Sequence, residues 1–557
     1  MQKIIDENYY DIIISNVMTP SYDTGDNITY MNYKNSIANI PVNSADPCDL
    51  GTYPYNAFPS ILTLNATVSL EKSGVGTVQR NPYLALFGRG VLVAVIDTGI
   101  DYQHPAFLFN DGTTRIISIW DQTIQEGIPP EGYTFGTEYT REYINTALKS
   151  ETPRSIVPST DTNGHGTAIA SIIAGRPNAD QSFSGVVPEA DLVIVKMKQA
   201  KNNLRKIFFV PEDLECYQET DLILGLGYVI SVARKLNRPV AVCVAMGTNQ
   251  SGHDGRGATS YFVNYLSLQP QTAIIIGTGN ESNKRRHYFN SIVQEPFSNT
   301  FELRVGEQDR LFAVELWPYA PSRLSIEIIA PNQETTGPIY PALGECRRFP
   351  FVLTQSVIWV NNYIFEEETG DQLILTRFQD PLPGVWKIHV QNLDTEQFSF
   401  HTWLPSGDLI SENTFFLNPD PNTTITSPGN ATSPLAITAY NQFDNSILPE
   451  SGRGYTRTGI VKPDLAAPGY QIPCAVPTGQ YGTVTGSGSA AAQATGIMAM
   501  IFEWAVPRGN YTTLTGNDAN RLLIRGATRQ SGATYPNNVW GYGQIQINSL
   551  FERLTNI

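Results

Sequence analysis

Three polar residues of the chain follow apolar or glycine-rich runs in a pattern suited to acyl-transfer chemistry. Asp97 ends the run VLVAVID, His165 stands in NGHGTAIA, and Asn280 follows the run TAIIIGTG. An Asp can orient a His that acts as general base, and an Asn amide can donate a hydrogen bond to an oxyanion. Each residue alone more often has a structural role, but the combination is far more specific. Together they predict the Asp–His pair and the oxyanion donor of a hydrolytic site.

The elements that must position these residues alternate between short apolar runs and helical patterns. Continuous Val/Ile runs separated by helices are typical of a parallel sheet that is covered on both faces. Active sites of such α/β folds gather at the carboxyl ends of the strands. The predicted strands span 91–97, 190–198, 239–247, 272–280 and 434–441, and the predicted helices span 165–175 and 218–237.

The pattern changes over residues 291–424, where alternating segments such as RLSIEIIAP and GVWKIHVQNL are separated by Pro, Gly and Asn. Alternation of this kind predicts an all-β sandwich or jelly roll. We therefore expect an α/β domain of residues 66–290 and 425–557, interrupted by an inserted β-domain. Residues 1–65 form a separate N-terminal unit, with strands expected at YYDIIIS (9–15) and NSIANIPVN (35–43).

Four motifs of the chain resemble those of the subtilisin-like serine protease family (S8). They are VAVIDTGID, NGHGTAIAS, GTGNES and GYTRTGIVKPDLAAPG, and they match the family's Asp, His, oxyanion-Asn and pre-nucleophile segments in the family order. The resemblance covers residues from about 75 to 290 and 425 to 557. It implies a subtilisin-like parallel sheet, with Asp97 and His165 as catalytic residues and Asn280 in the oxyanion hole.

The nucleophile position of this motif set holds a glycine. The family motif is G-T-S-x-A-x-P, with its Ser eight residues before a helix-packing Gly, and Gly488 stands eight residues before Gly496. Adjacent helix residues point about 100° apart, so Ser487 and Ser489 are expected to miss the His, which must lie within about 3 Å of a working hydroxyl. The sequence therefore predicts a pseudoprotease, with an active endopeptidase that uses a neighbouring Ser as the alternative.

Narrower features resemble the Csp subtilases of clostridial spore formers. These features are IWDQTI (119–124), the loop MGTNQSGHDGRG (246–257) and the β-insertion. The resemblance implies an inactive CspC- or CspA-like regulator of spore germination, with sister Csp proteases and a small-molecule germinant as partners. It also implies a prodomain of residues 1–65 that stays attached, with its tail near 59–66 in the cleft. A structural spore protein remains an alternative, and His253 and Asp254 are expected to be structural.

Composition excludes several other classes. The net charge of -15 and pI of about 4.9 argue against nucleic-acid binding, and runs such as NKRRH (283–287) are expected to be solvated. The five scattered cysteines argue against a disulfide framework and a thiolate zinc site, and no calcium-loop motif is present, so we expect no metal or cofactor. No apolar run approaches the ~20 residues that span a bilayer, and the N-terminus does not resemble a signal peptide. The expectation is synthesis in the cytoplasm and incorporation into the spore cortex or coat region.

Overall fold

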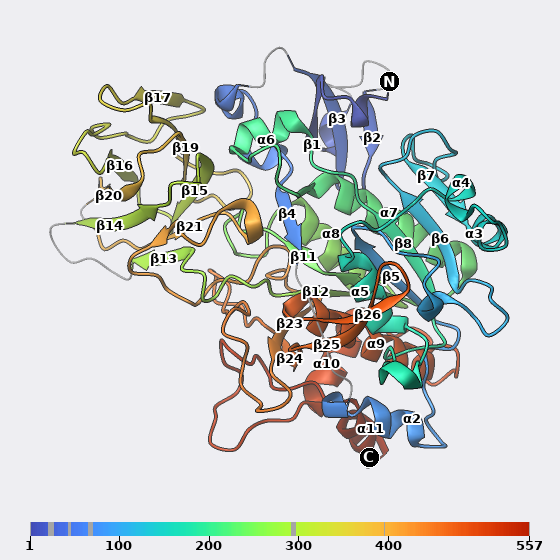
Figure 1. Cartoon of the computed structure of the whole chain (residues 1–557). Coiled ribbons are helices and arrows are strands. Elements are labelled where there is room, and N and C mark those ends of the chain that lie inside the picture. The colour runs from blue at the N-terminus through green and yellow to red at the C-terminus, as the bar shows by residue number, and fades with distance from the viewer. Residues whose placement is uncertain are drawn as a thin grey trace.

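An eight-stranded sheet forms the centre of the molecule (Figure 1), with the strand order β24-β23-β12-β10-β5-β8-β6-β7. The computed structural model describes residues 2–19, 27–42, 46–64, 71–290, 297–394 and 396–555. All neighbouring strands of the sheet are parallel except β6 and β7. The strands are β5 (Leu92–Asp97), β6 (Ile116–Asp121), β7 (Thr137–Thr140), β8 (Asp191–Lys196), β10 (Val240–Val244), β12 (Thr272–Gly277), β23 (Leu435–Tyr440) and β24 (Leu465–Pro468).

Helices cover both faces of this sheet. Alternation along β5 sends Val93 and Val95 into the core on the side of α5 and α9, and Ala94 and Ile96 into the core on the side of α7 and α8. The predicted α/β class with a subtilisin-like arrangement is therefore confirmed. The helices are α2 (Val75–Arg80), α3 (Arg141–Leu148), α4 (Pro153–Ile156), α5 (His165–Ala174), α6 (Asn202–Phe208), α7 (Glu219–Leu236), α8 (Ala258–Ser267), α9 (Ser487–Ala505), α10 (Gly516–Gly526) and α11 (Ile547–Thr555).

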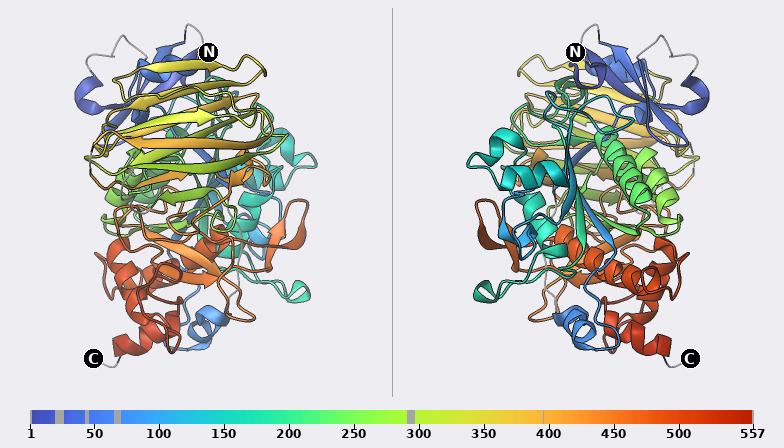
Figure 2. Two further views of the ribbon diagram at one scale, coloured as in Figure 1. Left: turned by 90° about the vertical axis from the view of Figure 1, so that its left-hand side faces the viewer. Right: turned by 90° about the vertical axis from the view of Figure 1, so that its right-hand side faces the viewer.

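Two antiparallel sheets, which we call the β-module, lie between β12 and β23 in the sequence. Their strand orders are β13-β21-β15-β19-β18-β17 and β16-β20-β14-β22, and one apolar core joins them. Figure 2 shows these strands stacked beside the central sheet. The strands are β13 (His287–Asn290), β14 (Ser298–Val305), β15 (Leu311–Pro318), β16 (Leu324–Ile329), β17 (Cys346–Pro350), β18 (Val357–Tyr363), β19 (Leu373–Gln379), β20 (Gly384–Asn392), β21 (Phe400–Trp403) and β22 (Phe415–Phe416).

The N-terminal unit, residues 2–64, contains a small antiparallel sheet in the order β1-β3-β2. Its strands are β1 (Tyr9–Ser15), β2 (Ile28–Tyr30) and β3 (Asn35–Pro41), so the first and last of these match the expected segments. Two 3-10 turns, η3 (Pro47–Gly51) and η4 (Tyr55–Ala57), lead to β4 (Ile61–Leu64). This last strand leaves the unit and joins the α/β domain.

Two expectations about the surface and the cysteines were wrong. Cys48 and Cys346 form a disulfide between the N-terminal unit and the β-module. The NKRRH run is not simply solvated, because Arg286 and His287 are 3% and 1% exposed. Both features depend on how segments distant in sequence meet, which composition does not encode.

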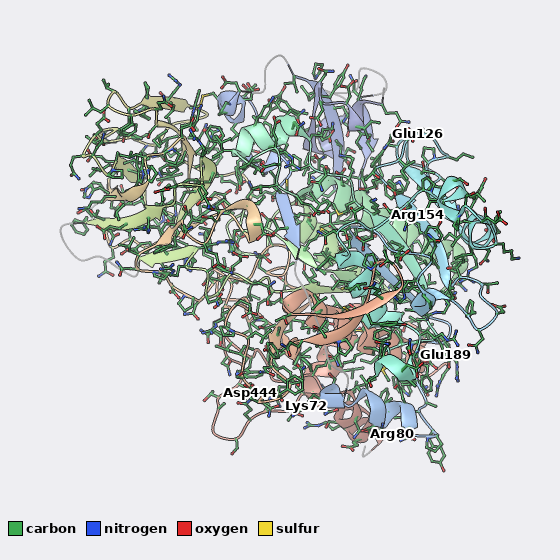
Figure 3. All side chains as sticks on the ribbon, in the orientation of Figure 1. Lys72, Arg80, Glu126, Arg154, Glu189 and Asp444 are labelled. Carbon is green, nitrogen blue, oxygen red and sulfur yellow. A yellow bond between two sulfur atoms is a disulfide. The ribbon has the colours of Figure 1, made fainter. Side chains whose placement is uncertain are left out.

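Charged side chains are exposed at several places on the surface of the molecule. Figure 3 labels Glu126, Arg154 and Glu189, which all lie on its outer surface. Within the described part of the chain, no helix combines the length and apolar character needed to cross a membrane.

Candidate active site

The side chains of Asp97 and His165 meet at the carboxyl edge of the central sheet. Asp97 is the last residue of β5 and is fully buried, and His165 is the first residue of α5. Nδ1 of His165 lies 2.8 Å from Oδ1 of Asp97, which also accepts a hydrogen bond from the backbone N of Thr98 at 2.8 Å. This contact fixes the orientation of the imidazole, so the pair has the geometry of a general base and its orienting carboxylate.

A buried carboxylate holds the turn that carries His165. Asp161 accepts hydrogen bonds from Thr98 Oγ1, from the backbone N of Gly164 and from both N and Oγ1 of Thr167, all at 2.6 to 2.8 Å. Gly164, with φ of 89°, precedes the helix in a backbone conformation that favours glycine. Asp161 therefore positions the His-bearing turn, and the sequence analysis missed it because its neighbour His165 carries the more recognisable chemistry.

The third predicted residue, Asn280, lies beside the start of α9. Its Oδ1 accepts a hydrogen bond from the backbone N of Ser487 at 3.0 Å, which fixes the orientation of the amide. The strand that leads to it approaches the helix closely: a Cβ on Gly277 would lie 3.0 Å from the backbone N and Cα of Gly488. The end of β12 and the start of α9 thus form one rigid corner, on which an amide donor is held in place.

Among the described residues, no hydrogen bond joins His165 to the hydroxyl of Ser487 or Ser489. Ser489 Oγ donates a hydrogen bond to the backbone O of Gly486 at 2.8 Å. The hydroxyl therefore makes a local contact at the start of the helix. Ser487 Oγ is buried and has no hydrogen-bond partner among the described residues. Gly488 lies between them and is also buried.

The register of this motif depends on Gly496, which lies eight residues, or about two helical turns, beyond Gly488 in α9. A Cβ on Gly496 would lie 2.4 Å from Cβ of Val186, so only glycine allows this approach of the helix. The packing role expected for Gly496 therefore agrees with the close approach at this position. The alignment that places Gly488 at the nucleophile position stays a prediction.

Strand β4 of the N-terminal unit lies between two short strands at the same edge of the domain. It pairs antiparallel with β9 (Tyr217–Gln218) on one side and with β11 (Met246–Gly247) on the other. Gln250 Oε1 accepts a hydrogen bond from the backbone N of Ile61 at 2.6 Å, and Ile61 and Leu62 are 0% and 2% exposed. The cleft formed by β9 and β11 is thus filled by a strand of the same chain. Residues 65 and 66 of the expected tail lie outside the described residues.

Side chains from the α/β domain and the β-module narrow the space around β4. Thr426 is wedged between two backbones, because a Cβ on Gly247 or on Gly279 would lie 2.3 Å or 2.6 Å from its side chain. From the other side, a Cβ on Gly407 would lie 2.7 Å from Thr63. A cavity of about 530 Å³ remains, lined by residues that include Thr63, Asn163, Asn280, Glu281, Arg286 and Asp408. No motif in the sequence indicates the contacts of Thr426 and Gly407, because they are made between distant segments.

The second His–Asp combination of the sequence does not form a pair. His253 donates from Nε2 to the backbone O of Asn249 at 3.1 Å and stacks on Trp403 with ring centroids 4.1 Å apart. Asp254 instead lies 3.7 Å from Arg256 and 3.8 Å from Arg457. Burial lowers the pKa of His253 to about 3, which keeps the ring neutral. The loop is packed rather than flexible, and within the described ranges no cluster of His, Cys, Asp or Glu could hold a metal ion.

Comparison with known proteins gives a consistent family assignment. The C5a peptidase of Streptococcus pyogenes serotype M6 is 22% identical over 456 residues, which are 74% of this chain and 34% of that protein. An intracellular serine protease of Paenibacillus polymyxa is 36% identical over 110 residues, which are 20% of this chain and 24% of that protein. The chain spans about a third of the length of the C5a peptidases it matches.

A solved structure matches over most of the chain. The CspB protease of Clostridium perfringens superimposes with a TM-score of 0.77 and 30% identity, over 87% of this chain and 99% of that one. This likeness supports placement in the Csp group of subtilisin-like proteins. The model of the subtilase family (peptidase S8) matches residues 88–291 and 413–543, and the stretch it leaves out contains most of the β-module. The chain therefore belongs to the subtilase family.

Proposed function

We propose that this chain is a catalytically inactive subtilase that acts through binding. The observation that carries this proposal is Gly488, which occupies the nucleophile position. The other residues of the site are in place, because His165 pairs with Asp97 and Asn280 is held at the start of α9. Without a nucleophilic oxygen no acyl-enzyme can form. In serine proteases that lose a residue of the catalytic triad, substrate binding and the oxyanion hole still accelerate hydrolysis by about 10³–10⁴-fold over water, far less than a complete site.

The contacts of the flanking serines weigh against an active endopeptidase. Ser489 Oγ is bonded to Gly486, and Ser487 Oγ has no hydrogen-bond partner within the described ranges. A serine nucleophile needs a base within hydrogen-bond reach of its hydroxyl. Residues 1–65 are then a prodomain that the chain does not remove, and its last strand keeps the cleft filled.

The likeness to CspB supports a role in the same process as a Csp protease. We propose that this chain regulates spore germination by signalling to an active sister protease that activates a cortex-lytic enzyme, with a small-molecule germinant as a possible input. It would reside in the spore, in the cortex or coat region. The chain differs from a working family member at one chemically decisive position, which suits a protein that kept its binding surfaces.

The test combines active-site labelling with the mass of the purified chain. We expect no labelling by a fluorophosphonate probe and a single chain that still carries residues 1–65. A labelled Ser487 or Ser489, or a chain that starts near residue 65, would favour the endopeptidase instead. To test the regulatory role, deletion of the gene should change the germination response while the spore coat assembles normally; a coat defect alone would favour a structural spore protein.

A further inference from the structure

The disulfide between Cys48 and Cys346 joins two parts of the chain that are 298 residues apart in sequence. Cys48 lies in η3 of the N-terminal unit, and Cys346 is the first residue of β17, the edge strand of the six-stranded sheet. Figures 1 and 2 show that the N-terminal unit and β17 lie at the same end of the molecule. The bridge therefore closes a covalent loop that contains β4 and the whole first part of the α/β domain.

The bridged cysteines are more accessible to a thiol in solution than the free cysteines of the chain. Both bridged cysteines are half-buried, whereas Cys216, Cys243 and Cys474 are free thiols buried in the α/β domain. Burial raises the pKa of these three thiols to about 11, 12 and 12. A thiol with a raised pKa carries little thiolate and reacts slowly. A solvent thiol therefore meets one reactive sulfur pair among the described residues.

The contacts around the bridge hold its two sides in register. Tyr363 donates its hydroxyl hydrogen to the backbone O of Leu50, and the buried Arg377 donates to the backbone O of Pro47. The backbones also touch, because a Cβ on Gly51 would lie 2.3 Å from the backbone O of Gly344. These contacts hold the two cysteines close together, and none of them involves a residue of the cleft.

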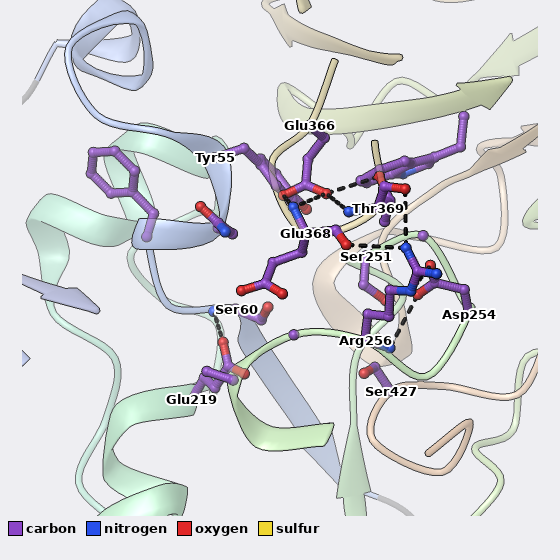
Figure 4. Close-up of a pocket in the computed structure, with 16 residues that line it drawn as sticks. Tyr55, Ser60, Glu219, Ser251, Asp254, Arg256, Glu366, Glu368, Thr369 and Ser427 are labelled. Atoms are coloured by element: carbon purple, nitrogen blue, oxygen red, sulfur yellow. Dashed lines mark hydrogen bonds and ion pairs between the residues drawn. The ribbon is translucent and has the colours of Figure 1, made fainter. Parts of the chain in front are cut away.

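The segment from the bridge to the cleft is anchored at two further points. The hydroxyl of Tyr55 donates to Glu315 Oε1 of the β-module at 2.5 Å, and the ring packs edge-on against Trp317 with centroids 5.9 Å apart. A few residues later, the backbone N of Ser60 donates to Glu219 Oε2 of α7 at 3.0 Å. Figure 4 shows Tyr55 and Ser60 facing residues of both the β-module and the α/β domain.

The bridge thus gives β4 a second covalent tether. Its C-terminal side is tethered to the α/β domain by the chain, and its N-terminal side is tethered to the β-module by the disulfide. A strand held at both ends returns to its partners from a high effective concentration, while a strand held at one end can swing away with its unit. Opening the bridge removes one of the two tethers without breaking a peptide bond.

We propose that the Cys48–Cys346 disulfide is a redox-sensitive latch, which holds the N-terminal unit on the β-module and keeps β4 in the cleft. A thiol reductant opens it in two exchange steps. The first thiolate attacks one sulfur and releases the other as a thiolate, which takes up a proton. The second thiolate then attacks the reductant's sulfur in the mixed disulfide and releases the remaining cysteine as a thiolate, which takes up a proton. Two reductant thiols are thus oxidised to a disulfide, and the protein gains two electrons and two protons as two Cys thiols.

This inference does not depend on whether residue 488 can act in catalysis. In a reducing compartment, disulfides are transient or regulatory rather than permanent. In that setting the latch is open during synthesis and closes only under oxidising conditions. Its state then sets how firmly the cleft is covered.

The experiment measures hydrogen–deuterium exchange on the full-length protein, first equilibrated with oxidised glutathione and then treated with dithiothreitol. We expect the amides of β1, β3 and β4 to exchange at least tenfold faster after reduction, while those of β10 and β12 keep their rates. The double variant C48S/C346S is expected to exchange fast with or without reductant. The matched control C216S keeps the bridge and should respond as the natural chain does.

Two results overturn the proposal. One is a count of five free thiols in the unfolded, glutathione-equilibrated chain, which would mean that the bridge does not form. The other is an unchanged exchange rate of β4 on reduction. The comparison of the natural chain before and after reduction needs no substitution, so it decides the question even if the double variant fails to fold.

Discussion

Nδ1 of His165 lies 2.8 Å from Oδ1 of Asp97, at the carboxyl edge of the central sheet. The imidazole and the carboxylate therefore have the geometry of a general base and its orienting group, and we predict that Gly488 occupies the nucleophile position beside them. Asn280 is held equally well by the backbone N of Ser487. On the proposed assignment of Gly488, the site lacks only the hydroxymethyl group of a serine, so its repair is a direct test of the proposed function.

Gly488→Ser should restore nucleophilic chemistry. The new hydroxyl would stand at the start of α9, at the position from which a family nucleophile meets its base. We expect labelling by a fluorophosphonate and cleavage within the segment that joins Leu64 to Glu71, seen as loss of the N-terminal unit on a reducing gel. The double variant Gly488→Ser/His165→Ala should lose at least about 10³-fold in labelling rate.

The control for this repair replaces the neighbouring serines. Ser487→Ala and Ser489→Ala in the Gly488→Ser background should each leave labelling in place, because their hydroxyls do not contact His165. If the repaired chain folds and still shows neither labelling nor cleavage, the site has decayed beyond residue 488.

Asn280→Ala, made in the Gly488→Ser background, tests the oxyanion donor. Loss of one preorganised amide donor lowers the rate of acyl transfer by about 10²–10³-fold in serine proteases. We expect a loss of that size in the rate of labelling, with little change in thermal stability, because the side chain accepts one hydrogen bond at a helix start. An unchanged rate would mean that Asn280 does not face the developing charge.

Gly496→Ala tests the register that places Gly488. The added methyl group would have to occupy space 2.4 Å from Cβ of Val186, so the helix or the loop must shift. Overpacking of this kind costs about 1–3 kcal/mol. The second variant, Val186→Ala/Gly496→Ala, should recover part of the loss in Tm, because it removes the opposing side chain. Equal Tm values for Gly496→Ala and the natural chain would contradict the close approach.

The sequence was sufficient for the parts of the site that local patterns encode. Strand β5 with Asp97 at its end and helix α5 with His165 at its start both follow from apolar runs and glycine positions a few residues long. Asn280 follows from the same kind of pattern. These features could be predicted because the candidate catalytic residues and the strand or helix that positions them lie in the same short segments.

The remaining features required the three-dimensional arrangement. The Cys48–Cys346 bridge links the N-terminal unit to the β-module, and Arg286 is buried by segments distant in sequence. No short-range sequence pattern predicts either feature. Thr426 is wedged between Gly247 and Gly279 although the three come from separate loops. Asp161 lies close to His165 in sequence, but its role is visible only through its four hydrogen bonds.

Glu315, at the junction of the N-terminal unit and the β-module, should make stability depend on pH. Burial raises its pKa to about 7, although hydrogen bonds from Tyr55, Trp317 and the backbone N of Ser251 act in the opposite direction. The usual value for a glutamate is 4.5. Between these two values the folded chain binds a proton that the unfolded chain does not, so Glu315 destabilises the fold as pH rises from 4.5 to 7.

Glu315→Gln removes this titration. The stability of the variant relative to the natural chain should increase by up to about 1.4 kcal/mol for each pH unit between pH 5 and 7 and stay constant above it. The check is the difference in Tm between the two proteins, measured at intervals from pH 5 to 8. The exposed Glu396→Gln serves as the matched control and should show no such trend. A Tm difference that does not change with pH would contradict the raised pKa. Because Tyr55 donates to this same carboxylate, the titrating group lies at the contact between the N-terminal unit and the β-module.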